Sequence, residues 1–109
     1  MDTQLKKGVL ELCILYQLKH KELYGYEIMK TVKDRFNDVY DGSIYAILRR
    51  LNADGYTETY TKDSPNGPVR KYYCITLTGS DYLYKMITEW QKMIDSVYKL
   101  GIPFKTPIF

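Results

Sequence analysis

The chain has 109 residues, of which 45% are apolar and 27% are charged, and its formal net charge is +3. This balance predicts one small globular domain, and the weak positive charge permits a polyanionic partner without requiring one. No stretch has the apolar length of a membrane span or the apolar core of a signal peptide, so we expect a cytoplasmic protein without a membrane partner.

Two helices are predicted in the first third of the chain. Residues Leu5–Lys19 carry apolar side chains on more than one side, which is typical of a central helix. In Tyr24–Phe36 the apolar side chains are spaced for packing on one side, and Lys30, Lys33 and Arg35 cover the other side.

The segment DGSIYAILRRLNADG, Asp41–Gly55, predicts a third helix, with an N-cap at Ser43 and a stop at Gly55. At 100° per residue its apolar side chains form one core-facing stripe: Ile44, Ile47, Leu48 and Leu51. The other side carries Tyr45, Ala46, Arg49 and Ala53, with Ser43 and Arg50 on the flanks. Small side chains beside a guanidinium suit a helix that enters a groove, although an amphipathic helix with solvated arginines would show the same pattern.

The periodicity then changes to that of strands. YTETYTK (Tyr56–Lys62) and RKYYCIT (Arg70–Thr76) predict two strands, and the turn-forming DSPNGP (Asp63–Pro68) between them predicts a β-hairpin. Gly79–Leu100 predicts a long helix of about 30 Å. The last nine residues contain two prolines and cannot continue it.

The predicted fold is mainly α with a small β-hairpin. Three helices followed by a hairpin form a winged helix-turn-helix in residues 1–78, followed by a C-terminal dimerisation helix in residues 79–100 and a tail in residues 101–109. In this fold the third helix enters the major groove of double-stranded DNA, and the hairpin reaches phosphates or the minor groove. The predicted DNA contacts are Ser43, Tyr45, Ala46, Arg49 and Arg50 of the third helix, Lys62, Arg70 and Lys71 of the hairpin, and Tyr24 and Lys30 of the second helix.

The basic side chains have different predicted roles. Arg49 can pair with guanine O6 and N7 or straddle a phosphate, because its guanidinium is a planar fork of donors. Arg70 and Lys71 stand at the base of the hairpin with Lys62 opposite, where they would hold the DNA backbone.

Three segments, YGYEIMK (Tyr24–Lys30), GSIYAILRRLNADGY (Gly42–Tyr56) and RKYYCITLTG (Arg70–Gly79), resemble the signature segments of PadR-type transcriptional regulators. The resemblance covers roughly residues 5–100 and implies a winged-helix repressor that dimerises through its C-terminal helix. Some members of that family release DNA on binding a small aromatic compound. The short C-terminal segment is similar to the small subfamily. Ala46 stands where many members have proline, and Asn52 where an acidic residue is common, so base preference is not carried over.

The long helix carries an apolar seam. Its a/d positions, at steps of four and three, are Leu83, Ile87, Trp90, Ile94 and Val97. A seam of this length exceeds what a small winged domain can cover, so we predict a homodimer with two half-sites on DNA. The alternative is a helix that folds back on its own domain.

Trp90 is the only tryptophan and lies midway along the seam. It could simply pack in the interface, or it could form one wall of a pocket for a planar aromatic effector. Small members of the resembled family use a tryptophan on this helix to sandwich flat ligands. The predicted effector site therefore combines Trp90 with Leu12 and Tyr16 as floor and Ile87 and Ile94 as walls.

Other chemistry is sparse in the sequence. With one histidine, His20, no catalytic set, metal site or cofactor site can be assembled, and an enzyme is not expected. Cys13 and Cys74 are predicted to be buried reduced thiols. Two alternative functions remain open: a winged-helix module that binds protein rather than DNA, and a redox sensor that acts through one of these thiols.

Overall fold

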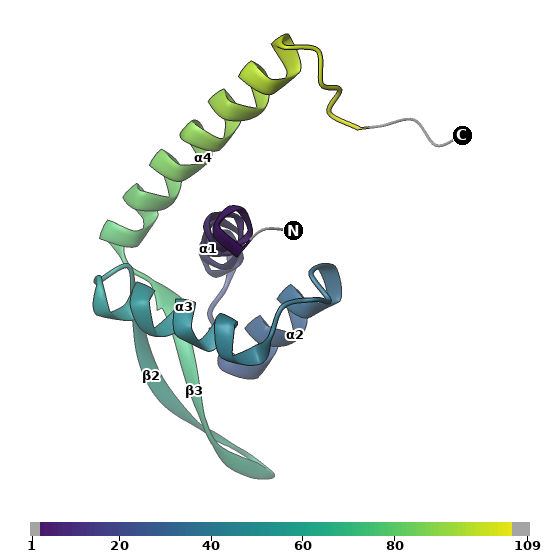
Figure 1. Ribbon diagram of the computed structural model, residues 1–109. Coiled ribbons are helices and arrows are strands. Elements are labelled where there is room, and N and C mark those ends of the chain that lie inside the picture. Colours follow the sequence, from purple (N-terminus) through teal and green to yellow (C-terminus); the bar gives the residue numbers. More distant parts are fainter. Residues whose placement is uncertain (1–2, 106–109) are drawn as a thin grey trace.

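The computed structural model describes residues 3–105, which form four helices and a small antiparallel sheet (Figure 1). The elements in chain order are α1 (Thr3–His20), β1 (Leu23–Tyr24), α2 (Gly25–Arg35), α3 (Asp41–Ala53), β2 (Thr57–Ser64), β3 (Gly67–Ile75) and α4 (Leu77–Lys99).

The predicted fold class is confirmed, since three helices are followed by a β-hairpin, the wing, and then by a long helix. The two long strands extend further toward the turn than predicted, because only Pro65 and Asn66 separate their ends. The long helix begins at Leu77, where the Thr76 hydroxyl caps it by accepting a hydrogen bond from the Gly79 N–H at 2.9 Å. Of the predicted tail, residues 106–109 lie outside the described residues.

The start of α3 corrects the predicted N-cap at Ser43. The helix begins at Asp41, and the Tyr40 carbonyl accepts hydrogen bonds from the N–H groups of Ser43 and Ile44 at 3.0 and 3.3 Å. Ser43 is therefore already inside the first turn. An acidic side chain at Asp41 suits this earlier start, since it lies at the positive end of the helix dipole. The predicted stop is confirmed by Gly55, which has a φ of 80°.

A third strand is an addition to the predicted hairpin. β1 pairs with β3, so that the sheet has the order β1-β3-β2. Leu23 lies opposite Tyr73, and Tyr24 lies opposite Tyr72. Two residues are too few to produce a periodic signal in a sequence, which explains why this strand was not predicted.

The two faces of the sheet have different environments because successive side chains of a strand alternate between faces. Leu23, Thr57 and Tyr73 are buried on the face that packs against the helices. The opposite face carries Tyr24, Tyr60 and Tyr72, and therefore places aromatic rings at the surface of the wing.

The hydrophobic core lies between α1, α2, α3 and the inner face of the sheet. All four side chains of the stripe predicted for α3 are buried, as are several side chains of α1. The buried apolar residues are Leu10, Ile14, Leu15, Leu18, Leu23, Ile28, Val32, Val39, Ile44, Ile47, Leu48, Leu51, Tyr73 and Leu83.

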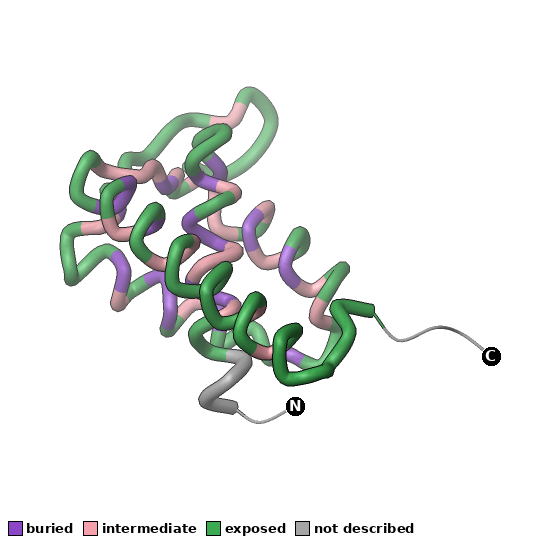
Figure 2. The backbone as a smooth tube through the Cα atoms, turned by 90° about the horizontal axis from the view of Figure 1, so that it is seen from above, coloured by how far each residue is buried: buried purple, intermediate pink, exposed green. Residues whose placement is uncertain are grey.

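The long helix joins this core only through its first turns. Leu83 is 1% exposed within its own chain, so it cannot be covered by a second subunit as predicted. Ile87 also packs partly against the core, whereas the C-terminal half of α4 is largely exposed (Figure 2). The radius of gyration is 15.9 Å, above the roughly 13 Å of a compact 100-residue domain. The projecting half of α4 accounts for this elongated shape.

The base of α4 is fixed against the turn that joins α3 to β2. The Tyr56 carbonyl accepts a hydrogen bond from the Thr76 N–H at 3.0 Å, and the ring of Tyr56 stacks on Tyr82 at 4.1 Å between centroids. A β-carbon added to Gly79 would lie only 1.9 Å from the Tyr56 oxygen. Glycine at position 79 is therefore what allows the helix to approach this turn so closely.

Candidate functional site

The outward side of α3 presents one guanidinium among small side chains. Arg49 and Ala46 are exposed, as are Gly42 and Ala53 on the same side of the helix. Burial raises the pKa of the Tyr73 hydroxyl, while the nearby positive charge of Arg49 acts in the opposite direction. Arg49 thus lies close to the sheet, at the corner between α3 and the wing.

Tyr45 and Ser43 flank this surface. Tyr45 is half-buried, with its ring against Gly25 at the start of α2, and Ser43 is exposed. The predicted reading side of α3 is therefore narrower than the sequence indicates, because Tyr45 also contributes to the packing between α2 and α3.

The basic residues of the wing fall on both of its faces. Lys62 and Arg70 are opposite each other in the hairpin, so they share the face that carries the exposed tyrosines. The Arg70 guanidinium lies 4.5 Å from the centroid of the Tyr24 ring, which brings together two of the predicted DNA contacts. Lys71 lies on the other face, with its ammonium 5.8 Å from the centroid of Tyr73.

Two positively charged groups can therefore be distinguished around the wing. Arg49 and Lys71 lie near Tyr73, toward α3, whereas Lys62 and Arg70 lie on the outer face. Lys30, the remaining predicted basic contact, is exposed on α2.

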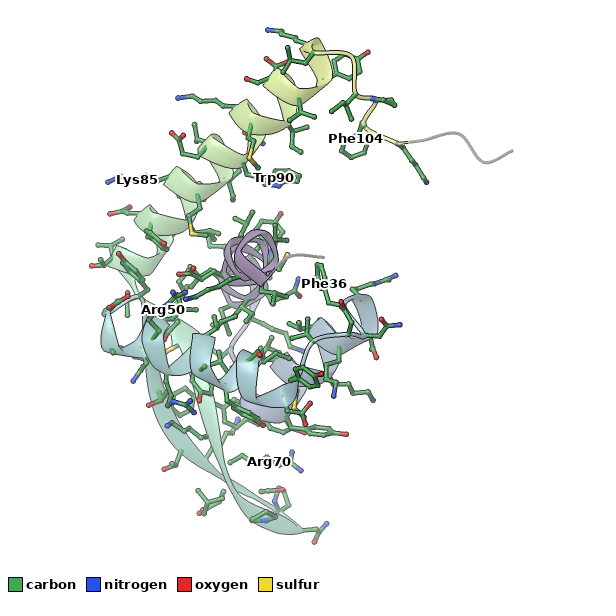
Figure 3. The ribbon with its side chains drawn as sticks, in the orientation of Figure 1. Phe36, Arg50, Arg70, Lys85, Trp90 and Phe104 are labelled. Atoms are coloured by element: carbon green, nitrogen blue, oxygen red, sulfur yellow. The ribbon has the colours of Figure 1, made fainter. Side chains whose placement is uncertain are left out.

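Arg50, another predicted DNA contact, is already paired within the domain. Its guanidinium forms an ion pair with Glu11 of α1, with Nη2 2.7 Å from Oε2, in a geometry that is not a well-aligned hydrogen bond. Figure 3 shows this side chain between α3 and α1. Position 50 lies about 100° from position 49 around the helix, which is enough to direct the second arginine toward α1.

Arg50 is also part of a polar link from α3 to α4. The Tyr82 hydroxyl donates a hydrogen bond to the second carboxylate oxygen of Glu11 at 3.4 Å. Burial raises the pKa of Tyr82, and the neighbouring Glu11 adds to this effect. Arg50, Glu11 and Tyr82 therefore connect α3, α1 and α4.

An open groove of about 600 Å³ lies between α1 and α4. Trp90 is 37% exposed on one side of it, and Figure 3 shows its ring directed away from Lys85. The groove is lined by Gly8, Val9, Leu12, Tyr82, Lys85, Met86, Glu89, Trp90 and Met93.

Only part of the predicted effector site lies in this groove. Trp90 and Leu12 are brought together, as predicted, but Tyr16 packs edge-on against His20 instead, with 4.8 Å between ring centroids. Ile87 and Ile94 do not line the groove formed by the described residues. They lie on the other side of Trp90 around α4, because a helix turns by about 100° per residue.

The sequence interpretation missed the two methionines of the groove. Met86 and Met93 stand four residues before and three residues after Trp90, on the same side of α4. In the sequence the two methionines lie beside the apolar seam and make the apolar side of the helix wider. The sequence does not show which edge of that apolar side faces α1.

The two thiols are half-buried rather than buried, and neither forms a disulfide. Burial raises the pKa of Cys13, and burial together with Glu22 and Glu58 raises that of Cys74. Both thiols are therefore less ionised at neutral pH than a free cysteine, which disfavours the alternative of a thiol-based sensor.

The described part of the chain has neither a metal-binding cluster nor a helix that could span a membrane. Among residues 3–105, no group of three or more histidine, cysteine or acidic side chains is arranged to bind a metal ion. None of the helices in this part combines the length and the apolar character needed to span a membrane.

Comparison with known proteins identifies close similarities over most of the chain. The model of the transcriptional regulator PadR-like family matches residues 14–85. A protein of Lysinibacillus sphaericus, described only as uncharacterized, is 34% identical over 94 residues, which cover 84% of this chain and 86% of that protein.

Solved structures that are similar to this chain are also transcriptional regulators. A PadR-like transcriptional regulator from Bacillus cereus is 39% identical with a TM-score of 0.81, covering 90% of this chain and 96% of that one. A transcriptional regulator from Streptococcus is 32% identical with a TM-score of 0.84, covering 93% of this chain and 100% of that one.

Proposed function

The chain belongs to the PadR-like family of transcriptional regulators, and we propose that it represses transcription as a homodimer whose DNA affinity falls when a planar aromatic compound binds. The family membership supports DNA binding and transcriptional regulation. Members of this family are regulators and not enzymes. The repressor role, the dimer and the effector are the proposed steps beyond it.

The observation that carries the DNA-binding mode is the outward side of α3. Arg49 is exposed between Ala46 and Ala53, so the helix backbone can approach the floor of a major groove while the guanidinium reaches a base edge. Arg70 and Lys62 on the wing then contact phosphates on the flank of the same site.

Replacing Arg49 with alanine tests this reading position. We expect specific DNA binding to weaken by about 1–3 kcal/mol and preference at one base position to relax, because one bidentate contact is lost. The measurement is a titration by gel shift of the promoter region upstream of the protein's own gene, repeated with substituted operators.

The control removes an equal charge far from the wing. Lys92→Ala on α4, where the lysine is largely exposed, should leave operator binding nearly unchanged. Equal losses of operator affinity for the two variants would show a general effect of charge. They would contradict a base contact by Arg49.

Dimerisation is supported by the exposed apolar side chains on α4. Trp90 and Met93 flank the groove, and Ile94 and Val97, two members of the predicted seam, are still half-exposed in a single subunit. A second copy of the helix would cover these side chains and would place two α3 helices on one DNA duplex.

The effector proposal rests on the groove and on its link to α3. A flat ligand against Trp90 would contact Tyr82, whose hydroxyl reaches Glu11, the partner of Arg50. A ligand that displaces Tyr82 would therefore alter the support of α3 and the angle between the two subunits. Such a ligand favours the DNA-free state only if it binds that state more tightly.

Fluorescence tests this proposal directly, because Trp90 is the only indole in the chain. We expect planar aromatic compounds to quench its emission saturably, with micromolar affinity or about −8 kcal/mol. Operator DNA should weaken ligand binding by the same factor as the ligand weakens DNA binding, since coupling is reciprocal. No saturable quenching across a broad panel would leave Trp90 as a packing residue of the interface.

A further inference from the structure

The outer face of the wing carries a row of three tyrosines, one from each strand. Tyr24 of β1 pairs with Tyr72 of β3, which in turn pairs with Tyr60 of β2. The rings of Tyr60 and Tyr72 are stacked at 5.5 Å with 13° between their planes, and Tyr24 packs on Tyr72 at 5.6 Å. These two ring contacts make the row a rigid feature of an otherwise exposed sheet face.

One end of the row is held by an acid. The Tyr60 hydroxyl donates a 2.7 Å hydrogen bond to Glu22, in the segment that connects α1 to β1. This hydrogen bond is the main cause that raises the pKa of Tyr60 to about 12. The aromatic row is therefore tied to the body of the domain at β2 as well as at β1.

The two cations of the outer face lie over this row. The Arg70 guanidinium is 4.5 Å from the Tyr24 centroid, and the Lys62 ammonium is 5.5 Å from the Tyr72 centroid. Both distances lie within the range of a cation–π interaction. Figure 3 shows Arg70 extending from the wing on the side beneath α2, where its charge is held away from the strand.

This arrangement argues against a surface on which nucleic-acid bases stack. Base-stacking platforms require free aromatic faces, whereas Tyr72 already has Tyr60 and Tyr24 beside it and Lys62 over it. Tyr24 and Tyr72 instead each have a cation over the ring.

We propose that Tyr24 and Tyr72 are positioning residues that hold Arg70 and Lys62 in the conformations in which they contact the DNA backbone. This inference rests on the proposed function, since it concerns how the wing of a DNA-binding protein is prepared for its phosphates. A long cationic side chain loses rotamer freedom when it binds a phosphate, and a ring beneath it removes part of that loss in advance.

Replacing Tyr24 is expected to lower operator affinity moderately without changing how that affinity depends on salt. Tyr24→Leu should weaken operator binding about 3- to 10-fold, because one immobilised side chain must be ordered on binding. The dependence of affinity on salt should keep its slope, since both cations can still reach phosphates, whereas Arg70→Ala should lower the slope by about 1.

The experiment is a double-mutant cycle measured by gel shift at several salt concentrations, with the wild-type operator from upstream of the protein's own gene. If Tyr24 acts through Arg70, Tyr24→Leu should change affinity less than about 2-fold in an Arg70→Ala background. Tyr24→Phe should behave as wild type because it keeps the ring. The corresponding cycle pairs Tyr72→Leu with Lys62→Ala.

Tyr84→Leu is the matched control, because Tyr84 lies under Lys19, 5.2 Å from its ammonium, but on α4. It should leave DNA binding unchanged, and thermal unfolding should show that all variants are folded. An equal loss from Tyr24→Leu with and without Arg70, or a loss from Tyr24→Phe, would overturn positioning in favour of a direct tyrosine contact. An unaffected Tyr24→Leu variant would overturn this inference alone, whereas a wild-type protein that binds no operator would overturn it together with the proposed function.

Discussion

Replacing Gly79 with alanine is expected to unfold the protein or to lower its free energy of unfolding by at least about 3 kcal/mol. The new β-carbon would lie 1.9 Å from the Tyr56 carbonyl oxygen and 2.8 Å from its carbonyl carbon. This backbone cannot move easily, because the same oxygen accepts a hydrogen bond from Thr76 and the Tyr56 N–H donates one to the Leu51 carbonyl at 2.9 Å. Thermal and urea unfolding followed by circular dichroism would measure the loss.

The loss of stability expected for Gly79→Ala is opposite in sign to the change that helix propensity alone would give. Alanine within a helix is more stable than glycine by about 1 kcal/mol, so Gly79→Ala would be stabilising if only the helix mattered. Gly8→Ala is the matched control, since this glycine also lies within a helix and has open space where the β-carbon would be added. Gly8→Ala should be neutral or stabilising, and a Gly79→Ala variant as stable as wild type would contradict the close contact between α4 and the α3–β2 turn.

Gly79 also illustrates what the sequence could not show. The sequence places it at the start of a long helix, where glycine suggests only a boundary. Glycine is required at position 79 because of Tyr56, which is 23 positions earlier in the sequence. The packing of the hairpin brings Tyr56 close to Gly79. Periodicity predicts elements, but a contact between two backbones depends on how those elements are assembled.

The core stripe of α3 could be predicted because it depends on one local property. Ile44, Leu48 and Leu51 recur at helical spacing, and any packing of an amphipathic helix buries that side. The direction of Arg50 could not be predicted in the same way. Its place beside Glu11 depends on which flank of α3 meets α1, and an amphipathic pattern does not specify the neighbour on a flank.

The same reasoning applies to the long helix. The seam from Leu83 to Val97 is continuous in sequence, but the structure divides it between two environments. Leu83 is inside its own subunit, whereas Ile94 and Val97 lie beyond the core and are half-exposed. A periodic stripe predicts that something covers it, and the three-dimensional arrangement determines which part is covered by the same chain.

The second large effect is expected from Met93→Glu, which should convert the proposed dimer into a folded monomer. Met93 is 47% exposed in a single subunit, so a glutamate there can remain hydrated while the subunit folds. In a dimer closed through α4 the same carboxylate would be buried without a partner, at a cost of several kcal/mol. Sedimentation equilibrium at micromolar concentration would report the mass, and circular dichroism would report the fold.

Thr88→Glu provides a control with the same change of charge on the same helix. Thr88 is exposed and lies about 140° from Met93 around α4, on the side away from the groove. This variant should remain dimeric if the interface follows the seam. A Met93→Glu variant that stays dimeric, or a wild-type protein that sediments as a monomer, would contradict the proposed interface.

Loss of the dimer should have a larger effect on DNA binding than loss of any one contact. Two linked α3 helices bind two half-sites with the second at high effective concentration, which contributes about 10²- to 10⁴-fold to affinity. Met93→Glu should therefore weaken operator binding by this factor, even though Arg49, Arg70 and Lys62 are unchanged. Binding to a single half-site should be affected far less, because each subunit keeps its own reading helix and wing. This difference between full and half operators separates a damaged interface from a damaged DNA-binding surface.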